Sequence, residues 1–170
     1  MIIDGWVQAE SGEPKAAVAR IREGLRVYAS TGAALFAPYF RSLLARACAR
    51  NGETEAGLEA IGEALRQARA TGELVWEPEL LRLEGEMRLG LRPADAAGAR
   101  DCFHRAIEIA RTEGARSWEL RATLSLARVL AADDQRAEGH RILRGVYDWF
   151  TEGFDTPDLT DARTLLDELA

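Results

Sequence analysis

The sequence predicts an all-α fold in which antiparallel helix pairs stack into an α-solenoid, with a repeating unit of 40–42 residues. Apolar residues recur every three or four positions throughout the chain, and no stretch shows the two-residue alternation of a β-strand. The pattern also repeats at long range, because small residues return at intervals of 40, 42 and 40 positions. These residues are Ala17, Gly57, Ala99 and Gly139. A fixed period of this length indicates a stacked array.

Three further columns keep the same intervals, one of small and two of bulky apolar residues. They are Gly24, Ala64, Ala106 and Val146; Ile21, Ile61, Phe103 and Leu143; and Leu25, Leu65, Ile107 and Tyr147. The other helix of each pair carries its own small column at Gly5, Ala45, Gly85 and Ala127. Small residues let the helices of a pair approach closely, and bulky ones fill the space between pairs.

The elements follow from local start and stop signals. Residues 1–11 predict only the tail of a helix, and Pro14 opens the next helix, which runs to about Ser30. Thr31-Gly32 stops that helix, because glycine adopts the left-handed conformation at little cost. The same stop recurs at Thr71-Gly72 and Glu113-Gly114, and an aromatic then begins a new helix at Phe36, Trp76 and Trp118. These helices are expected over 36–51, 76–91 and 117–133.

The end of the chain predicts a cap. A helix over about 136–152 completes the last unit, and Thr156-Pro157-Asp158 starts another helix with one apolar stripe and one acidic face. A terminal helix with one polar, solvent-exposed face closes a solenoid. Trp149 and Phe150 are expected to anchor this capping helix. The predicted organisation is one domain, 1–170, divided into a truncated first repeat 1–32, repeats 33–72, 73–114 and 115–153, and a capping helix 156–170.

The composition of the chain argues against several classes of binding surface and cellular location. A net charge of −6 and a pI near 5.1 argue against a general nucleic-acid or anionic-membrane surface. The start of the chain lacks a signal peptide, and no stretch approaches the ~20 apolar residues of a membrane helix. Two cysteines are too few for a disulfide framework. These features predict a cytoplasmic protein.

The repeats resemble the tetratricopeptide repeat (TPR). Leu44-Ala45 and Leu126-Ala127 occupy the Leu-Gly pair of that motif, and Gly57…Ala64 and Ala99…Ala106 occupy its pair of small residues. The units depart from the motif in being longer than its ~34 residues, in having Cys48 where a tyrosine is usual, and in lacking a terminal proline. The resemblance implies a TPR-like solenoid with helices longer than usual.

A narrower resemblance covers essentially the whole chain and is most specific at its end. GVYDWFTEGFDTPDLTDARTLLDEL, at 145–169, is similar to the carboxyl terminus of large bacterial signalling proteins. Those proteins join an adenylate/guanylate (class III) cyclase domain and an AAA-type ATPase to a C-terminal helical-repeat region. GWVQAESGEP at 5–14, ASTGAALFAPYF at 29–40 and WEPELLRLEGE at 76–86 add support. The resemblance implies a regulatory or interaction region without the catalytic domains.

No catalytic, cofactor or metal site is predicted. Lys15 lies in GEPKAAV, which is no phosphate-binding loop. Cys102 and His104 point to different sides of a helix and cannot share an ion. No serine or cysteine has a histidine partner at a recognisable spacing. The chain is therefore predicted not to be an enzyme.

Transferring TPR geometry places a partner-binding groove along the first helix of each pair. The groove residues expected from this register are Tyr39, Ser42, Arg46, Glu79, Arg82, Glu86, Arg121, Leu124 and Arg128. The arginines could form a basic track for an acidic peptide, since guanidinium groups suit carboxylates. They could equally pair with glutamates of neighbouring helices. Trp76 and Trp118 are interpreted as packing between units.

Three functions remain open. The first is a non-catalytic scaffold for protein–protein interaction. The second is homodimerisation through the open N-terminal end, where Ile2, Ile3, Trp6 and Val7 would expose apolar surface unless further repeats precede them. The third is a small-ligand sensor that binds in the groove.

Overall fold

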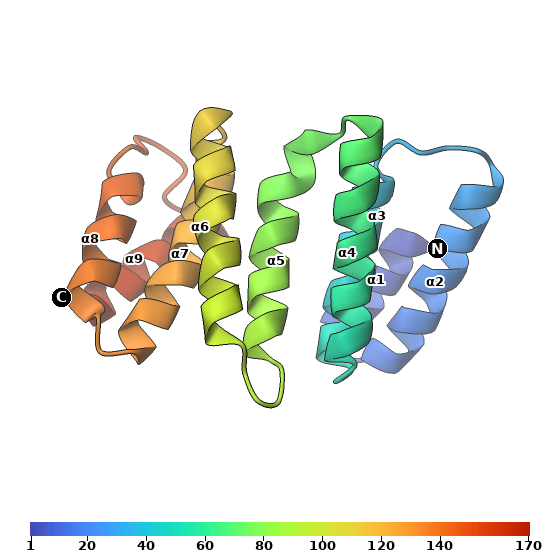
Figure 1. Cartoon of the computed structure of the whole chain (residues 1–170), viewed down its shortest axis with the longest axis horizontal. Helices are drawn as coiled ribbons and strands as arrows, with labels where there is room; N and C mark the ends of the chain where they lie inside the picture. The colour runs from blue at the N-terminus through green and yellow to red at the C-terminus, as the bar shows by residue number, and fades with distance from the viewer.

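The computed structural model describes residues 1–170 and contains nine α-helices, one short 3₁₀ helix and no strand. The elements are α1 (Ile2–Glu10), α2 (Pro14–Ser30), α3 (Ala37–Arg50), α4 (Thr54–Thr71), η1 (Leu74–Trp76), α5 (Glu77–Leu89), α6 (Ala96–Thr112), α7 (Arg116–Ala132), α8 (Arg136–Tyr147) and α9 (Pro157–Leu169). Consecutive helices pair side by side along the long axis of the molecule (Figure 1). The predicted all-α fold of stacked helix pairs is confirmed.

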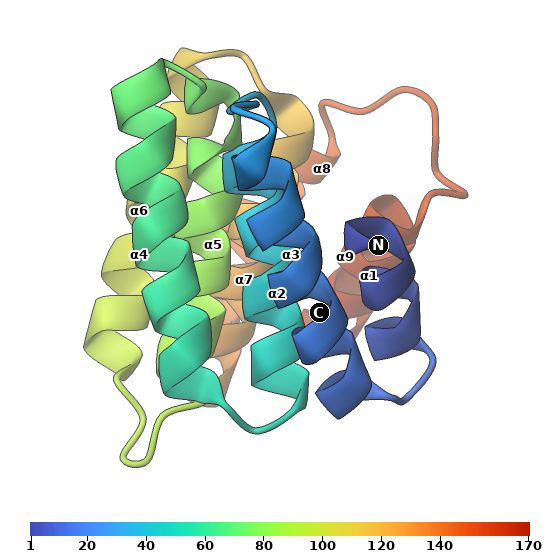
Figure 2. The same cartoon turned by 90° about the vertical axis from the view of Figure 1, so that its right-hand side faces the viewer.

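The helices form two layers. Figure 2 shows α1 and α9 on one side of the molecule and α4 and α6 on the other. Helices α1, α3, α5 and α7, the first of each pair, form the layer that contains the groove described below. None of the helices is both long and apolar enough to span a lipid bilayer.

Small residues lie where the two helices of a pair meet. A methyl group at Gly57 would lie 3.1 Å from the carbonyl oxygen of Ala45, and one at Gly139 would lie 3.0 Å from that of Ala127. At Gly85 a methyl group would come within 2.5 Å of the Phe103 ring. At Gly5 a methyl group would lie 3.2 Å from the carbonyl oxygen of Ala17. The close approach of helices that the small columns predict is therefore present in all four pairs.

The bulky column forms the middle of the core. Ile21, Ile61, Phe103 and Leu143 are all completely buried. Around them the core divides into a central cluster and two smaller ones near the ends of the chain. Each unit therefore contributes one equivalent apolar side chain to a continuous interior, as expected of a solenoid.

Helix boundaries agree closely with the local signals, with two differences. Gly72 ends α4 with a φ of 75°, and prolines occupy the first turns of α2, α3, α5 and α9. The helix predicted over 136–152 is wrong at its end, because α8 stops at Tyr147. There the N–H groups of Trp149 and Phe150 bond to the Val146 and Tyr147 carbonyls, three residues back, and this tighter pattern ends the helix.

The second difference concerns the cap. Helix α9 buries Leu159, Leu165, Leu166 and other apolar residues against α7 and α8, as predicted. Thr156 precedes it, but its hydroxyl donates to the Gly153 carbonyl and makes no capping bond. Phe150 packs on this cluster, whereas Trp149 is exposed beside Arg116. Trp149 is therefore not the anchor that the sequence suggests.

Successive units are joined by a repeated ion pair that the sequence analysis missed. Arg69 at the end of α4 donates to Glu77 at the start of α5. The equivalent residues 42 positions later, Arg111 and Glu119, pair in the same way at 2.5 Å. Glu119 is almost completely buried. Both pairs link the last turn of one unit to the first turn of the next.

We expect Thr123→Val to raise the free energy of unfolding by about 1 kcal/mol. Thr123 is completely buried in α7, and its hydroxyl has no hydrogen-bond partner. Valine keeps the shape and removes the unsatisfied group. Urea denaturation would measure the change. The control is Thr112→Val, whose exposed hydroxyl donates to the Glu108 carbonyl, and which should not gain stability.

We also expect Asp95→Asn to reduce the loss of stability in acid. The Asp95 carboxylate accepts a hydrogen bond from the Gly98 N–H at the start of α6 and another from Arg88, and both lower its pKa. A carboxylate with a lowered pKa stabilises the fold above its unfolded pKa, near 4, and this stability is lost as the pH falls through the folded value.

Asparagine can still cap the helix but does not titrate. The difference in melting temperature between the two proteins should therefore be largest near neutral pH and shrink below about pH 4. Thermal unfolding recorded across this range tests the expectation, and a difference that does not change with pH would contradict it.

Candidate binding groove

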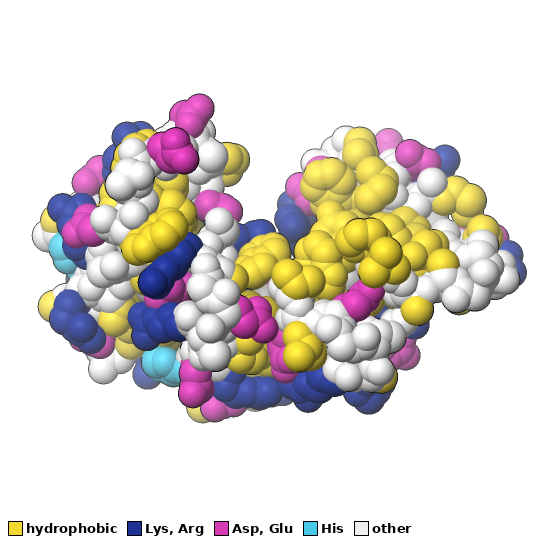
Figure 3. Space-filling view, turned by 90° about the horizontal axis from the view of Figure 1, so that it is seen from above, with side chains coloured by type: hydrophobic (Ala, Val, Ile, Leu, Met, Phe, Trp, Pro, Cys, Tyr) yellow, Lys and Arg dark blue, Asp and Glu magenta, His cyan; other side chains and the backbone are white.

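A hollow lies between the two ends of the array. Figure 3 shows it from one end of the helices, with hydrophobic side chains on its floor and along one wall. Its residues come from the odd-numbered helices and from η1. We call this hollow the concave groove.

The groove contains a cavity of about 230 Å³, which we call the aromatic pocket. Its wall contains four aromatic side chains, supplied by α1, α3, η1 and α7. The lining residues are Trp6, Tyr39, Ser42, Leu43, Arg46, Trp76, Glu79, Leu80, Trp118 and Arg121. The pocket therefore depends on all four helix pairs being stacked.

Three of the aromatic side chains contact one another in sequence. The ring centroids of Tyr39 and Trp76 lie 4.9 Å apart, and those of Trp76 and Trp118 lie 6.4 Å apart. The guanidinium group of Arg121 lies 5.2 Å from the Trp118 ring. The sequence analysis interpreted Trp76 and Trp118 as packing between units. They do pack there, but both stay partly exposed and line the pocket. Their regular spacing was the signal that could have assigned them to the groove.

A network of buried charges forms the polar side of the groove. The Glu79 carboxylate accepts hydrogen bonds from Arg82 at 2.7 and 2.9 Å and pairs with Arg121 at 2.8 Å. Arg82 also bonds to Glu86, which accepts a bond from Ser125. Burial works against the charge on Arg82, but its bonds to Glu79 and Glu86 outweigh this and raise its pKa. Arg82 is thus permanently charged and held in place.

The predicted basic track is therefore largely neutralised. Arg46 lies 3.5 Å from Glu10, Arg128 lies 3.9 Å from Asp161, and Arg121 adds a contact to Asp158 at 3.8 Å. Every arginine of the predicted track has a carboxylate partner, which is the alternative the sequence left open. The longest of these contacts are Arg46–Glu10, Arg121–Asp158 and Arg128–Asp161. The pairs that Glu79 makes with Arg82 and Arg121 are short.

Two other predicted groove residues differ from the rest. Leu124 is buried in the C-terminal core cluster, so its placement in the groove is wrong. Ser42 lines the aromatic pocket, but its hydroxyl already donates to the Tyr39 carbonyl at 2.7 Å. The helical register that placed Leu124 was transferred from shorter repeats, and α7 is 17 residues long.

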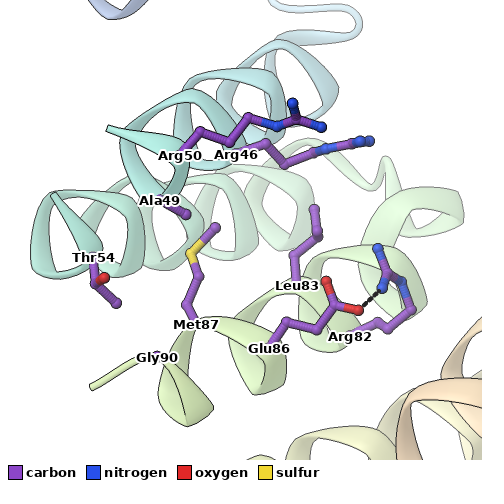
Figure 4. A pocket seen from close by; sticks show the side chains of 9 residues that line it. All are labelled: Arg46, Ala49, Arg50, Thr54, Arg82, Leu83, Glu86, Met87 and Gly90. Carbon is purple, nitrogen blue, oxygen red and sulfur yellow. Dashed lines mark hydrogen bonds and ion pairs between the residues drawn. The ribbon is translucent and has the colours of Figure 1, made fainter. Parts of the chain in front are cut away.

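A second cavity, of about 310 Å³, opens beside the first between α3 and α5. Arg46 and Arg50 extend over one side of it from α3, while Arg82 and Glu86 lie across from them on α5 (Figure 4). Arg50 holds Glu10 at 2.6 Å, closer than Arg46 does. Arg46 therefore borders both cavities, and its ion pair with Glu10 is longer than the one that Arg50 makes with the same carboxylate.

The four apolar residues near the N-terminus do not form one exposed surface. Ile3 and Val7 are about half exposed on the outer face of α1. Ile2 is buried against α2, where Gly24 leaves room for it, and Trp6 turns into the aromatic pocket. Of the four residues predicted to form an open end, only Ile3 and Val7 lie on it.

No group of three or more His, Cys, Asp or Glu side chains is arranged to hold a metal ion. Cys48 and Cys102 are buried, and burial raises the pKa of both thiols. A thiol in this environment is protonated and a weak nucleophile. The groove is thus the feature of the structure that requires a functional explanation.

No protein-family model and no curated protein matches the chain. Solved structures do match it. One is a variant of the TPR-like repeats of a kinesin light chain-like protein from Podosopora anserina, with a TM-score of 0.74, 17% identity, and coverage of 99% of this chain and 82% of that one. The unaltered protein gives a TM-score of 0.73 with the same identity and coverage. The chain has a TPR-like α-solenoid fold.

Proposed function

We propose that this protein is a non-catalytic scaffold that binds a segment of another protein in the concave groove. The observation that carries the proposal is the aromatic pocket, whose four rings come from different helices and are only partly buried. Aromatic side chains gathered in a concave, partly desolvated site are typical of binding hot spots.

The charges favour an acidic partner segment. Arg46 and Arg128 are 34% and 52% exposed, and their carboxylate partners lie at 3.5 and 3.9 Å. Such exposed pairs contribute little stability, so a partner carboxylate can replace Glu10 or Asp161 at small cost. The two arginines lie on α3 and α7, which would align an extended segment across the helices.

The larger context that we propose is a bacterial signalling protein of the cytoplasm. The similarity of residues 145–169 to the end of cyclase–ATPase proteins supports this assignment. In that context the groove would bind either the catalytic domains or a protein that regulates them. The expected partner therefore includes an ATPase or nucleotide-cyclase domain.

The test compares two double charge reversals. Arg46→Glu with Arg128→Glu changes the groove, while Arg26→Glu with Arg141→Glu changes equally basic and more exposed positions on α2 and α8. Each protein, with circular dichroism confirming its fold, is used to capture partners from a lysate, and these are identified by mass spectrometry. We expect one partner set to be lost only with the groove variant. Equal capture by all three proteins would contradict groove binding.

A second candidate is self-association through the outer face of α1, and the repeat register favours it. One repeat later, Ile3 and Val7 correspond to Leu43 and Ala47, which are buried. In the second unit these positions are covered by the unit before it, since Leu43 and Ala47 pack with residues of α1 and α2. Val7→Glu should convert a dimer into a monomer in sedimentation experiments. A parent chain that is monomeric at high concentration would rule this candidate out.

A further inference from the structure

The aromatic pocket has walls suited to a flat ring. Tyr39 and Trp76 are tilted by 31° at 4.9 Å, and Trp118 meets Trp76 at 61° and 6.4 Å. Offset and edge-to-face contacts at such centroid distances are the favoured geometries of aromatic groups. A ring placed among these side chains would find both kinds of contact.

One of the arginines that line the pocket lacks a close carboxylate partner of its own. Its charged residues are Arg46, Arg121 and Glu79. Glu79 is fully engaged, since it already binds Arg121 and Arg82. Arg46 has only Glu10, at 3.5 Å, and Glu10 lies closer to Arg50. The pocket therefore favours a negatively charged group beside Arg46.

A hydrogen-bond acceptor is also missing. The indole N–H of Trp6 is buried and has no partner in the protein. Unsatisfied buried donors are uncommon in folded proteins. Because Trp6 lines the pocket, the chain leaves an unsatisfied donor in the pocket wall.

The cavity is small. Its volume of about 230 Å³ is below the roughly 300–1,000 Å³ of sites for drug-sized ligands. It accommodates one ring with a short acidic side chain, and leaves no room for a nucleotide.

From these four features we propose that the aromatic pocket binds a small aromatic carboxylate. The ring lies among Tyr39, Trp76 and Trp118, and the carboxylate pairs with Arg46. Because the pocket is built from all four helix pairs, its occupancy stabilises their stacking. The site is the same aromatic pocket and uses the same Arg46 as the proposed partner groove, but binding of a small acid does not require a protein partner.

Tryptophan fluorescence provides a direct test, because three of the four tryptophans line the pocket. The intact chain is titrated with phenylacetate, benzoate and 3-phenylpropanoate. Phenylacetamide serves as the neutral analogue and acetate as the acid without a ring. We expect saturable binding of at least one aromatic acid with a dissociation constant of about 1 mM or tighter. Phenylacetamide and acetate should bind at least about tenfold more weakly.

Three variants complete the test. Arg46→Met should weaken binding about tenfold or more. Glu10→Gln should tighten it, because its carboxylate no longer competes for Arg46, and a merely structural role for Arg46 would not produce this gain. Trp149→Phe removes the tryptophan outside the pocket and should leave the titration unchanged.

The proposal is overturned if none of the three acids gives a saturable signal, if the amide binds as well as the acid, or if Arg46→Met has no effect. None of these measurements involves a protein partner. A failure here is therefore separate from a failure of the groove test.

Discussion

Replacing Phe103 with alanine is expected to lower the free energy of unfolding by about 3–5 kcal/mol. Phe103 is completely buried at the centre of the largest core cluster, and its ring lies directly against Gly85. Alanine would therefore leave a cavity between α5 and α6. Since a domain is stable by about 5–15 kcal/mol in total, urea denaturation should show a large fall in the midpoint.

The companion change tests the same contact from the other side. Gly85→Ala should cost about 1–3 kcal/mol, because its methyl group overlaps the Phe103 ring. In a double variant with Phe103→Leu this cost should shrink, which a double-mutant cycle would show. Gly145→Ala in α8 is the control, since nothing lies within 4 Å of the added methyl group. It should stabilise the helix by about 0.5–1 kcal/mol. A neutral Gly85→Ala would contradict the packing described here.

Replacing Glu79 with alanine is expected to destabilise the protein by about 3 kcal/mol. The change removes the main partner of Arg82, whose side chain is 9% exposed, and one partner of Arg121. A buried charge without its partner is costly, although Glu86 still neutralises part of it. Chemical denaturation measures the effect.

Two further variants separate charge from packing. Adding Arg82→Met to Glu79→Ala should restore part of the stability, because no buried charge is then left unpaired. Glu138→Ala breaks an ion pair of the same spacing on the exposed face of α8 and should have no measurable effect. If Glu79→Ala proves no more harmful than Glu138→Ala, the buried network is not important for stability.

Sequence alone predicted the order and pairing of the helices because their signals are local and repeated. Gly72 and the prolines at helix starts set the helix ends in their own neighbourhood. The column from Ile21 to Leu143 marks the buried face of one helix in each unit. Tyr39, Arg46 and Arg121 of the expected groove line one pocket, and their role in binding a partner stays a prediction.

The charge state of the groove could not be predicted in the same way. Glu79 lies 42 residues from Arg121 in sequence, and Arg46 lies 36 from Glu10. Whether these groups meet depends on how far successive units rotate, which no local pattern specifies. The same holds for Trp6, whose register fits either the end of the array or the groove. Only the stacked structure places it in the pocket wall.

The repeated ion pair between units has a mechanical consequence. Arg69–Glu77 and Arg111–Glu119 fasten the third unit to the second and the fourth to the third. The equivalent positions at the preceding junction are Ala29 and Ala37, which can make no such link. The junction between α2 and α3 therefore lacks the ion pair that strengthens the two later junctions. Bending there would move Trp6 relative to Trp76 and so widen or narrow the mouth of the pocket.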